Sequence, residues 1–400
     1  MIRRFEKYLQ YICCLFRINI ANIVVFVFRQ DLLKEDIWLI KEKRTEARDN
    51  GYHFFKYLCE KHPEINAYYV ITNDSSDLQK VNKIGKTIQA DSFKHYMYYL
   101  SAKYNIGSQP YGAAPSPDSW NYKFRKLCRK DNKFVFLQHG ITKADIPGLY
   151  YKKTKFDLFV CSAEREYDYL KERFGYNDSN LKLTGLCRFD NLNYPKSKNI
   201  ILIMPTFRSF LTAKNREKPA TDKEQEKFKE SRFYFGFSNL LKNTRLKEYL
   251  SKSGFSIIFY LHYSFQSFNG CFSEFGDSNI IIADRKQYDV QKLLLDSSIL
   301  VTDFSSVFFD FAYMMKPEVF FQPDADEFLS HHYAEGYFDY SLDGFGPVFS
   351  DVEMTVNYIK RIIDNGCLME DEYKKRVNAF FTLRDNHNCE RTFNAIKELD

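Results

Sequence analysis

NYPKSKNIILIMP, residues 193–205, divides the 400-residue chain into two halves that follow the same pattern. Residues 193–199 are polar and contain Pro195, as is typical of a linker. Residues 199–205 form a short apolar run, which predicts a buried strand. Comparable runs predict further strands at residues 37–40, 66–72, 104–109, 133–140, 156–162, 181–185, 256–262, 279–284, 298–303 and 317–322.

Helical segments separate these predicted strands. They cover residues 53–60, 92–102, 163–174, 239–252, 288–296, 305–315 and most of 351–399, with Asn50–Gly51 predicted as a turn. Strands joined by single helices predict an α/β fold with parallel sheets and right-handed crossovers. Two such halves of similar size indicate the GT-B fold, in which two Rossmann-like domains face each other across a cleft. We expect these domains to span residues 36–193 and 199–400, the second including the C-terminal helices.

Composition excludes several classes of protein. The 58 Lys and Arg residues exceed the 52 Asp and Glu residues by only 6, which favours anionic small molecules or a membrane surface over nucleic acid. The nine cysteines form no C-x-x-C pair, and the chain has no Walker loop, H-E-x-x-H or G-x-G-x-x-G motif. We therefore expect no metal site and no resident cofactor. The sequence leaves open whether a divalent cation assists.

Residues 1–35 form a basic and apolar N-terminal segment. Its most apolar part, ICCLFRINIANIVVFVF at residues 12–28, is shorter than the roughly 20 residues that a membrane span requires. Flanking basic residues suit a helix that lies in the surface of an anionic membrane. A buried first helix with ordinary flanking charge is an equally good interpretation.

The segment LVTDFSSVFFDF, residues 300–311, carries the first candidate site. A strand runs into Thr302 and Asp303, and Ser305 and Ser306 then begin an apolar helix. Small hydroxyl residues at a helix start leave backbone N–H groups free to bind a pyrophosphate. The alternative is an ordinary serine N-cap.

Two histidines and two arginines follow other predicted strands. His139 ends FVFLQHG and His262 ends SIIFYLH, positions from which an imidazole can act as a general base. Arg188 in TGLCRFD and Arg208 in MPTFR have comparable positions, and guanidinium groups match phosphate oxygens. Structural histidines and surface ion pairs, with Asp190 as a partner for Arg188, are the alternatives.

At these residues the chain resembles the CDP-glycerol glycerophosphotransferase family, which includes the teichoic acid primases and polymerases. The resemblance runs through the segments IWLIKEKRTEARDNGYHFFKYL, FLQHGITKAD, LTGLCRFDNL, MPTFR, LHYSF and VTDFSSVFFDFAYMMKPEVFF. It implies a GT-B enzyme, peripheral on the cytoplasmic face of the plasma membrane, with an acceptor-side first domain and a CDP-donor-binding second domain.

The resemblance also implies roles for the candidate residues. His139 matches a proposed catalytic base, and His262 a histidine proposed to act on the phosphate or leaving group. The residues that match the donor pyrophosphate and CDP site are Arg188, Arg208, Thr302, Asp303, Ser305 and Ser306. The implied reaction transfers glycerol phosphate, or another alditol phosphate, from a CDP-activated donor to a hydroxyl of a glycan or lipid-linked acceptor, releasing CMP.

The sequence also fits two other functions. A GT-B glycosyltransferase that uses a nucleotide sugar would share the fold and the pyrophosphate site. A catalytically silent binding subunit of a capsule or wall-polymer assembly would share them too. The sequence does not distinguish CDP-glycerol from CDP-ribitol as the donor, nor teichoic acid from capsule as the product.

Overall fold

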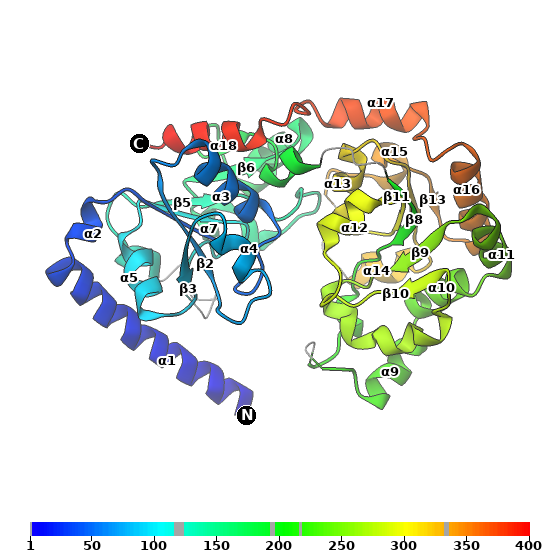
Figure 1. Ribbon diagram of the computed structural model, residues 1–400, viewed down its shortest axis with the longest axis horizontal. Helices are drawn as coiled ribbons and strands as arrows, with labels where there is room; N and C mark the ends of the chain where they lie inside the picture. Colours follow the sequence, from blue (N-terminus) through cyan, green and yellow to red (C-terminus); the bar gives the residue numbers. More distant parts are fainter. Residues whose placement is uncertain (1, 116–123, 193–196, 216–217, 332–335) are drawn as a thin grey trace. The chain divides into compact units, whose positions relative to one another are not determined.

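The computed structural model describes residues 2–115, 124–192, 197–215, 218–331 and 336–400. These residues form two compact units, each with its own parallel sheet (Figure 1). Unit 1 comprises residues 1–141, 147–191 and 383–400, and unit 2 comprises residues 142–146 and 192–382. The predicted linker at residues 193–199 lies mostly outside the described residues. The predicted α/β class with two Rossmann-like sheets is confirmed.

Unit 1 contains a seven-stranded sheet in the order β3-β2-β1-β4-β5-β6-β7, and all its pairs are parallel. Its strands are β1 (Ile37–Lys41), β2 (Asn66–Ile71), β3 (Lys86–Gln89), β4 (Tyr104–Gly107), β5 (Lys133–Phe136), β6 (Leu158–Cys161) and β7 (Leu181–Leu183). Its helices are α1 (Ile2–Ile23), η1 (Val24–Phe28), α2 (Asp31–Lys34), α3 (Asn50–Lys61), α4 (Leu78–Asn82), α5 (Phe93–Ser101), η3 (Arg125–Leu127), η4 (Pro147–Leu149), α7 (Tyr151–Thr154), α8 (Glu164–Phe174), η5 (Cys187–Asn191) and α18 (Asn388–Lys397).

Unit 2 contains a six-stranded parallel sheet in the order β10-β9-β8-β11-β12-β13. Its strands are β8 (Lys198–Ile203), β9 (Ser256–Phe259), β10 (Ile280–Ile282), β11 (Ser297–Thr302), β12 (Glu318–Phe321) and β13 (Val348–Phe349). Its helices are η6 (Ser209–Leu211), α9 (Asp222–Lys229), α10 (Arg232–Leu241), α11 (Thr244–Ser253), η7 (Tyr263–Phe275), α12 (Val290–Asp296), α13 (Val307–Tyr313), α14 (Ala325–His331), α15 (Tyr340–Asp343), α16 (Val352–Asp364) and α17 (Asp371–Phe380).

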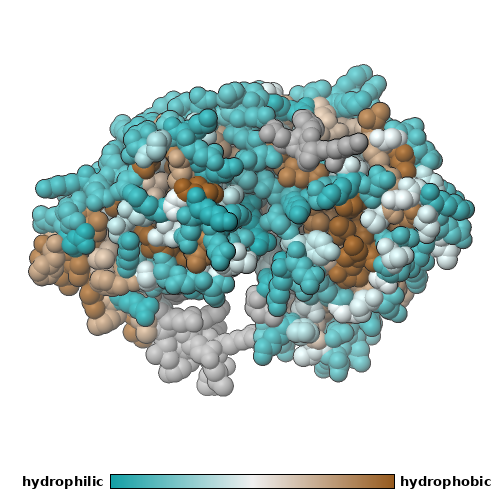
Figure 2. Space-filling view, in the orientation of Figure 1, coloured by the Kyte–Doolittle hydropathy of each residue, from teal (hydrophilic) through white to brown (hydrophobic). Residues whose placement is uncertain are grey.

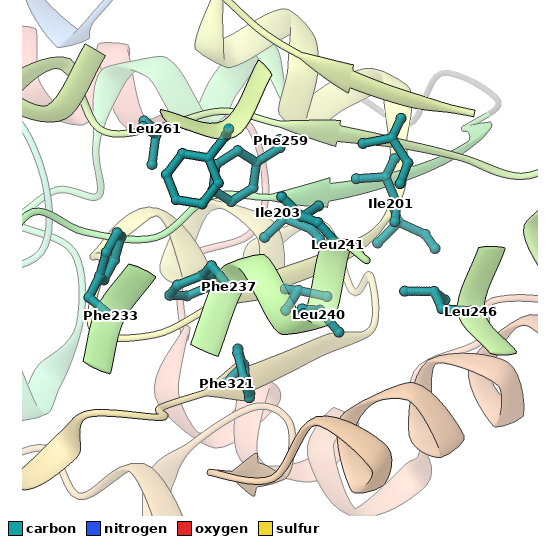
Figure 3. Close-up of a cluster of buried hydrophobic side chains, with 14 of the residues drawn as sticks. Ile201, Ile203, Phe233, Phe237, Leu240, Leu241, Leu246, Phe259, Leu261 and Phe321 are labelled. Atoms are coloured by element: carbon teal, nitrogen blue, oxygen red, sulfur yellow. The ribbon is translucent and has the colours of Figure 1, made fainter. Parts of the chain in front are cut away.

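The core of unit 2 explains why its strands are nearly continuous apolar runs. Parallel strands covered by helices on both faces bury both sets of side chains. Figure 3 shows one face of this core, where Ile203 and Phe259 from the sheet lie near Phe237 and Leu241 of α10. All four side chains are fully buried. This packing holds the carboxyl ends of the strands in a fixed row.

Several local predictions differ from the structure. Strands β3 and β13 were not predicted, because three of the four residues of KTIQ are polar and VF is only two residues long. Asn50–Gly51 begins α3 instead of forming a turn, since Asp49 caps the helix through the Asn50 N–H. The helix predicted at residues 239–252 is two helices, because Asn243 ends one and caps the next through the Leu246 N–H.

The C-terminal helix α18 departs from the expected range of the second domain, residues 199–400. It packs in unit 1, beside α3 and β6. Asp190 accepts hydrogen bonds from the backbone N–H groups of Asn388 and Cys389, at 2.9 and 2.8 Å, and so caps the helix. Phe393 stacks on Trp38 of β1. Cap and core contacts therefore fix the chain's last helix to the first sheet.

The N-terminal helix α1 and the η1 turn that continues it together have two apolar faces. Cys14, Ile18, Ala21 and Val25 recur at helical spacing and are buried, and α1 packs against α5. The opposite stripe, which is solvent-exposed, consists of Ile12, Phe16, Ile20, Ile23 and Val27. Figure 2 shows this apolar surface in brown along the helix.

The N-terminal helical segment is longer than the apolar run that was read from the sequence. Helical structure runs without a break from Ile2 through Phe28, so length no longer excludes a membrane span. Residues Tyr11–Phe28 have a mean hydropathy of 2.0 and are long and apolar enough to cross a membrane by length and composition alone. About a fifth of that window, 22%, is buried inside the protein.

Candidate active site

His139 sits on a strained turn that follows β5 in unit 1. The preceding residue, Gln138, has a φ of +58°, a left-handed conformation that is costly for a residue with a side chain. The Gln138 amide is buried and donates to Val160 O at 2.7 Å and to Glu166 Oε1 at 3.0 Å. These bonds hold the turn in place and leave His139 exposed at its tip.

Asn50 fixes the same turn from the start of α3. Its Nδ2 donates to the carbonyl oxygens of Leu137 and Gln138, at 3.2 and 2.9 Å, and its Oδ1 accepts from the Arg188 N–H at 3.0 Å. One buried amide therefore joins the His139 turn to η5. Sequence reasoning missed Asn50 because an Asn-Gly pair is more typical of a surface turn.

Arg188 forms an ion pair with Asp49, with 2.8 Å between Nη1 and Oδ1. The alternative partner suggested by the sequence, Asp190, instead caps α18. Arg188 is only 8% exposed, so most of its guanidinium lies within the protein. Asp49 and Arg188 both act on His139: the pKa of this imidazole is lowered mainly by desolvation, and Arg188 lowers it further while Asp49 opposes the shift.

Glu42, which directly follows β1, supports this arrangement. It accepts backbone hydrogen bonds from Arg48 and Asp49 at 2.9 Å each and from Tyr52 at 2.6 Å. Burial and the charge of Asp49 raise the pKa of Glu42 to about 8, although the three N–H groups oppose this. Glu42 thus organises the loop that carries Asp49 and Asn50.

In unit 2, Asp303 joins the ends of two strands. Its Oδ1 accepts from the Thr206 N–H at 2.8 Å and from the Phe304 N–H at 2.5 Å. Its Oδ2 lies 2.8 Å from Nη1 of Arg208. Thr302 continues the connection, since its hydroxyl donates to Met204 O at 2.7 Å. Hydrogen bonds and an ion pair therefore connect the loop after β8 to the loop after β11.

Arg208 is fully buried and shared between two carboxylates. Asp324, which follows β12, accepts from Nε and Nη2 of Arg208 at 2.7 and 2.6 Å. The guanidinium also lies over the rings of Phe233 and Phe328, each 4.8 Å from its centroid. Arg208, Thr302 and Asp303 were predicted to belong to the donor pyrophosphate and CDP site, and in the structure each has internal partners and no exposed surface.

His262 lies beside this assembly. Its Nδ1 accepts from the Ser264 N–H at 3.2 Å, so the neutral ring carries its proton on Nε2. The imidazole stacks on Phe207, with 4.8 Å between centroids. Because Phe207 is flanked by Thr206 and Arg208, His262 is packed against the loop that Asp303 holds.

Ser305 and Ser306 remain partly exposed beyond Asp303. Ser306 is the N-cap residue of α13, but its side chain makes no capping hydrogen bond. The alternative of an ordinary serine cap is therefore not what this chain forms. The structure places His262, Thr302, Asp303, Ser305 and Ser306 at the carboxyl edge of one sheet, where open α/β sheets bind ligands.

Within the described residues, no group of three or more His, Cys, Asp or Glu side chains could hold a metal ion. The buried carboxylates Asp303 and Asp324 are paired with Arg208. The two histidines have different surroundings and lie in different units.

Comparison with known proteins then decides the family. Residues 22–398 match the model of CDP-glycerol:poly(glycerophosphate) glycerophosphotransferases. The chain belongs to this family. The resemblance inferred from the sequence segments is therefore confirmed.

Relatives in this family are larger proteins. The chain is 34% identical over 375 residues to the minor teichoic acid biosynthesis protein GgaB of Bacillus subtilis strain 168, covering 92% of this chain and 40% of that protein. It is 27% identical over 235 residues to the teichoic acid poly(glycerol phosphate) polymerase of the same strain, covering 58% of this chain and 28% of that protein. The chain thus spans less than half the length of these relatives.

The fold is similar to that of the wall teichoic acid polymerase TagF, with a TM-score of 0.68 at 16% identity over 100% of both chains. It is more distantly similar to UDP-GlcNAc 2-epimerase from Neisseria meningitidis, with a TM-score of 0.51 at 10% identity over 90% of this chain and 99% of that one. These likenesses confirm the GT-B type of fold for this family member.

Replacing Arg208 by Met is expected to lower the free energy of unfolding by about 3–5 kcal/mol at pH 8, because Asp303 and Asp324 would be buried without their cation. Burial already raises the pKa of Asp303, and Arg208 lowers it, so the variant raises it further. An acid with a raised folded-state pKa stabilises the fold at low pH and less as pH rises. The loss should therefore be smaller at pH 5 than at pH 8.

Urea unfolding followed by circular dichroism at both pH values measures this difference. Arg232→Met is the matched control, since Arg232 is exposed on α10 of the same unit. Equal stabilities of the Arg208→Met variant and the wild type would show that the guanidinium does not hold the loops together.

Proposed function

We propose that this protein transfers glycerol phosphate, or another alditol phosphate, from a CDP-activated donor to an acceptor hydroxyl and releases CMP. The product would be a teichoic-acid-like or capsular polymer of the cell surface. The observation that carries the proposal is His139, an exposed residue held on a strained turn after β5 in a chain of the glycerophosphotransferase family.

His139 is suited to act as the general base. Its lowered pKa keeps the imidazole neutral at pH 7, so one ring nitrogen is free to accept a proton. In the proposed step the acceptor hydroxyl loses its proton to His139, and its oxygen forms a bond to the phosphorus of the donor's alditol phosphate. The bond from that phosphorus to the bridging oxygen breaks, and CMP leaves with the electron pair.

The groups of unit 2 are suited to bind the donor's phosphates. His262 can donate from Nε2, because Nδ1 is occupied by the Ser264 N–H. Ser305 and Ser306 offer hydroxyl and backbone donors in a partly exposed loop. The roles proposed for Thr302, Asp303 and Arg208 are to hold this loop, and for Arg188 to tune the charge around His139 through Asp49.

The relatives support CDP-alditols as the donor class. They include teichoic acid polymerases named for poly(glycerol phosphate) and for poly(ribitol-phosphate), and one TagF structure was obtained after soaking with CDPG. Parallel assays with CDP-glycerol, CDP-ribitol and a panel of nucleotide sugars, each followed by release of the nucleotide, would identify the donor. Release of a nucleoside diphosphate from a sugar donor would favour a glycosyltransferase, and binding without turnover would favour a silent subunit.

His139→Ala is expected to lower kcat for CMP release from the active CDP-alditol by at least about 100-fold, the usual contribution of a general base. Donor binding should change little, because the phosphate-binding groups lie in unit 2. His387→Ala is the control, as His387 is an exposed histidine paired with Glu390. A wild-type rate in the His139→Ala variant would overturn the assignment of the base.

The pH dependence of kcat/KM gives a second test. Activity should fall as pH drops through the pKa of His139, which lies below its usual value of about 6.5. Because Asp49 raises this pKa, Asp49→Asn is expected to move the acid limb of the profile to lower pH. Asp178→Asn, at an exposed position of the same unit, is the control. An acid limb that stays in place or moves upward would contradict His139 as the titrating group.

We further propose that the protein works on the cytoplasmic face of the plasma membrane, with α1 lying on the lipid surface. The exposed stripe of Phe16, Ile20 and Val27 is apolar along several turns, while the opposite face is anchored to unit 1. Arg17 is exposed beside this stripe and can meet anionic headgroups. A lipid-linked acceptor would be reached from this position.

Phe16→Ser combined with Val27→Ser is expected to lower binding to vesicles of equal parts phosphatidylglycerol and phosphatidylcholine by at least about tenfold, since both side chains would bury apolar surface in the lipid. Co-sedimentation measures the bound fraction. Leu342→Ser with Leu368→Ser removes two equally exposed apolar side chains from unit 2 and should leave binding unchanged. Equal binding by the two double variants would contradict the proposal.

A further inference from the structure

Lys143 belongs to unit 2, although it follows His139 by only four residues. Residues 142–146 group with residues 192–382 because their backbone packs against that unit. The approach is close: a Cβ added to Gly336 would lie 1.8 Å from Lys143 O and 2.8 Å from the Cα of Ala144. Only glycine fits at position 336, so the backbone of residues 143 and 144 packs directly against unit 2 at this point.

The side chain of Lys143 lies near the loop after β11. Its ammonium is 5.6 Å from the ring centroid of Tyr340, and the charge of Asp303 acts on it. Burial lowers the pKa of Lys143 to about 8, against the opposing effect of Asp303, so the group is mostly protonated at neutral pH. Within the described part of the chain, its Nζ makes no hydrogen bond and no ion pair.

Asp303 favours the charged form of Lys143 but forms no ion pair with it. Its two oxygens are already occupied by the Thr206 and Phe304 N–H groups and by Arg208. The Tyr340 hydroxyl is buried and has no hydrogen-bond partner among the described residues, and burial holds the pKa of Tyr340 well above its usual value. Lys143 is therefore a partly desolvated cation beside a polar group that lacks a partner.

A cation at this edge of the sheet would strengthen binding of a diphosphate beyond what neutral hydroxyl and N–H donors provide. Arg208 cannot supply it, because its guanidinium is fully buried between Asp303 and Asp324. Lys143 lies at this place, and its ammonium makes no hydrogen bond or ion pair with the described residues.

We propose that the ammonium of Lys143 binds the diphosphate of the nucleotide donor in unit 2, beside Asp303 and Tyr340. This inference rests on the proposed function for the identity of the donor. Its physical basis is that a partly desolvated lysine gains more from a phosphate oxygen than from water, since the local dielectric is lowered and part of the hydration is already lost. The Tyr340 ring underneath keeps the flexible side chain in position.

Calorimetric titration of the full-length protein with CDP, CMP and cytidine tests the proposal directly. Lys143→Met is expected to weaken CDP binding by about 10- to 100-fold, the range for a hydrogen bond to a charged group. Cytidine binding should stay at the wild-type level, because the nucleoside carries no phosphate. Lys143→Arg should recover most of the CDP affinity, because arginine restores the positive charge. It should not recover all of it, because arginine does not restore the packing of the lysine side chain.

Lys229→Met is the matched control, as Lys229 is exposed on α9 of the same unit. Equal CDP affinities of the wild type and Lys143→Met would overturn the proposal, as would equal losses of CDP and cytidine binding, which indicate a collapsed site. A wild type that binds no CDP would overturn it too.

The outcome is separate from that of the proposed function. Turnover is measured independently, as CMP released from CDP-glycerol and CDP-ribitol by the wild type. Turnover with unchanged CDP affinity in Lys143→Met would reject the lysine and keep the transferase. Loss of CDP affinity in the variant without turnover by the wild type would keep a nucleotide-diphosphate site and reject the transferase.

Discussion

A single buried carboxylate, that of Asp303, accepts hydrogen bonds from two backbone N–H groups and pairs with Arg208, which in turn pairs with Asp324. These contacts join the loops that follow β8, β11 and β12. Burying charges costs several kcal/mol per ion unless each is paired and hydrogen-bonded, so the arrangement is stable only as a whole. The partly exposed Ser305 and Ser306 take their position from it.

Unit 1 uses the same principle with a different set of groups. Glu42 and Asn50 hold backbone N–H and carbonyl groups around the turn that presents His139. The left-handed backbone of Gln138 costs of the order of 1–3 kcal/mol and persists because its amide is bonded to Val160 and Glu166. In both units, buried polar residues hold a loop in place and leave a neighbouring residue of that loop exposed or partly exposed.

Much of the fold could be predicted because parallel strands covered on both sides read as apolar runs, as NIILIMP does for β8. The edge strands β3 and β13 could not, since an edge strand buries less and KTIQ carries a weaker apolar signal. The assignment of α18 to unit 1 also lay beyond the sequence. It depends on Asp190 and Trp38, which are about 200 or more residues away from their partners in the helix.

The sequence indicated which loops form the candidate site, but not which of their residues are buried and ion-paired and which are exposed. A motif such as MPTFR shows that an arginine follows a strand, and a guanidinium suits phosphate and carboxylate equally well. Which of the two it meets depends on Asp303 and Asp324, which come from distant parts of the chain.

The ion pairs of Arg208 also affect how an anion could bind. Because Asp303 and Asp324 are both paired with Arg208, these three residues present no net positive charge, and a cation for an anionic substrate would come from another residue. Lys143 can supply this cation. It is partly desolvated, its backbone packs against Gly336, and the neighbouring Asp303 is already paired with Arg208. Part of the hydration of Lys143 is lost during folding, so binding a phosphate oxygen replaces interactions with water that the ammonium no longer makes.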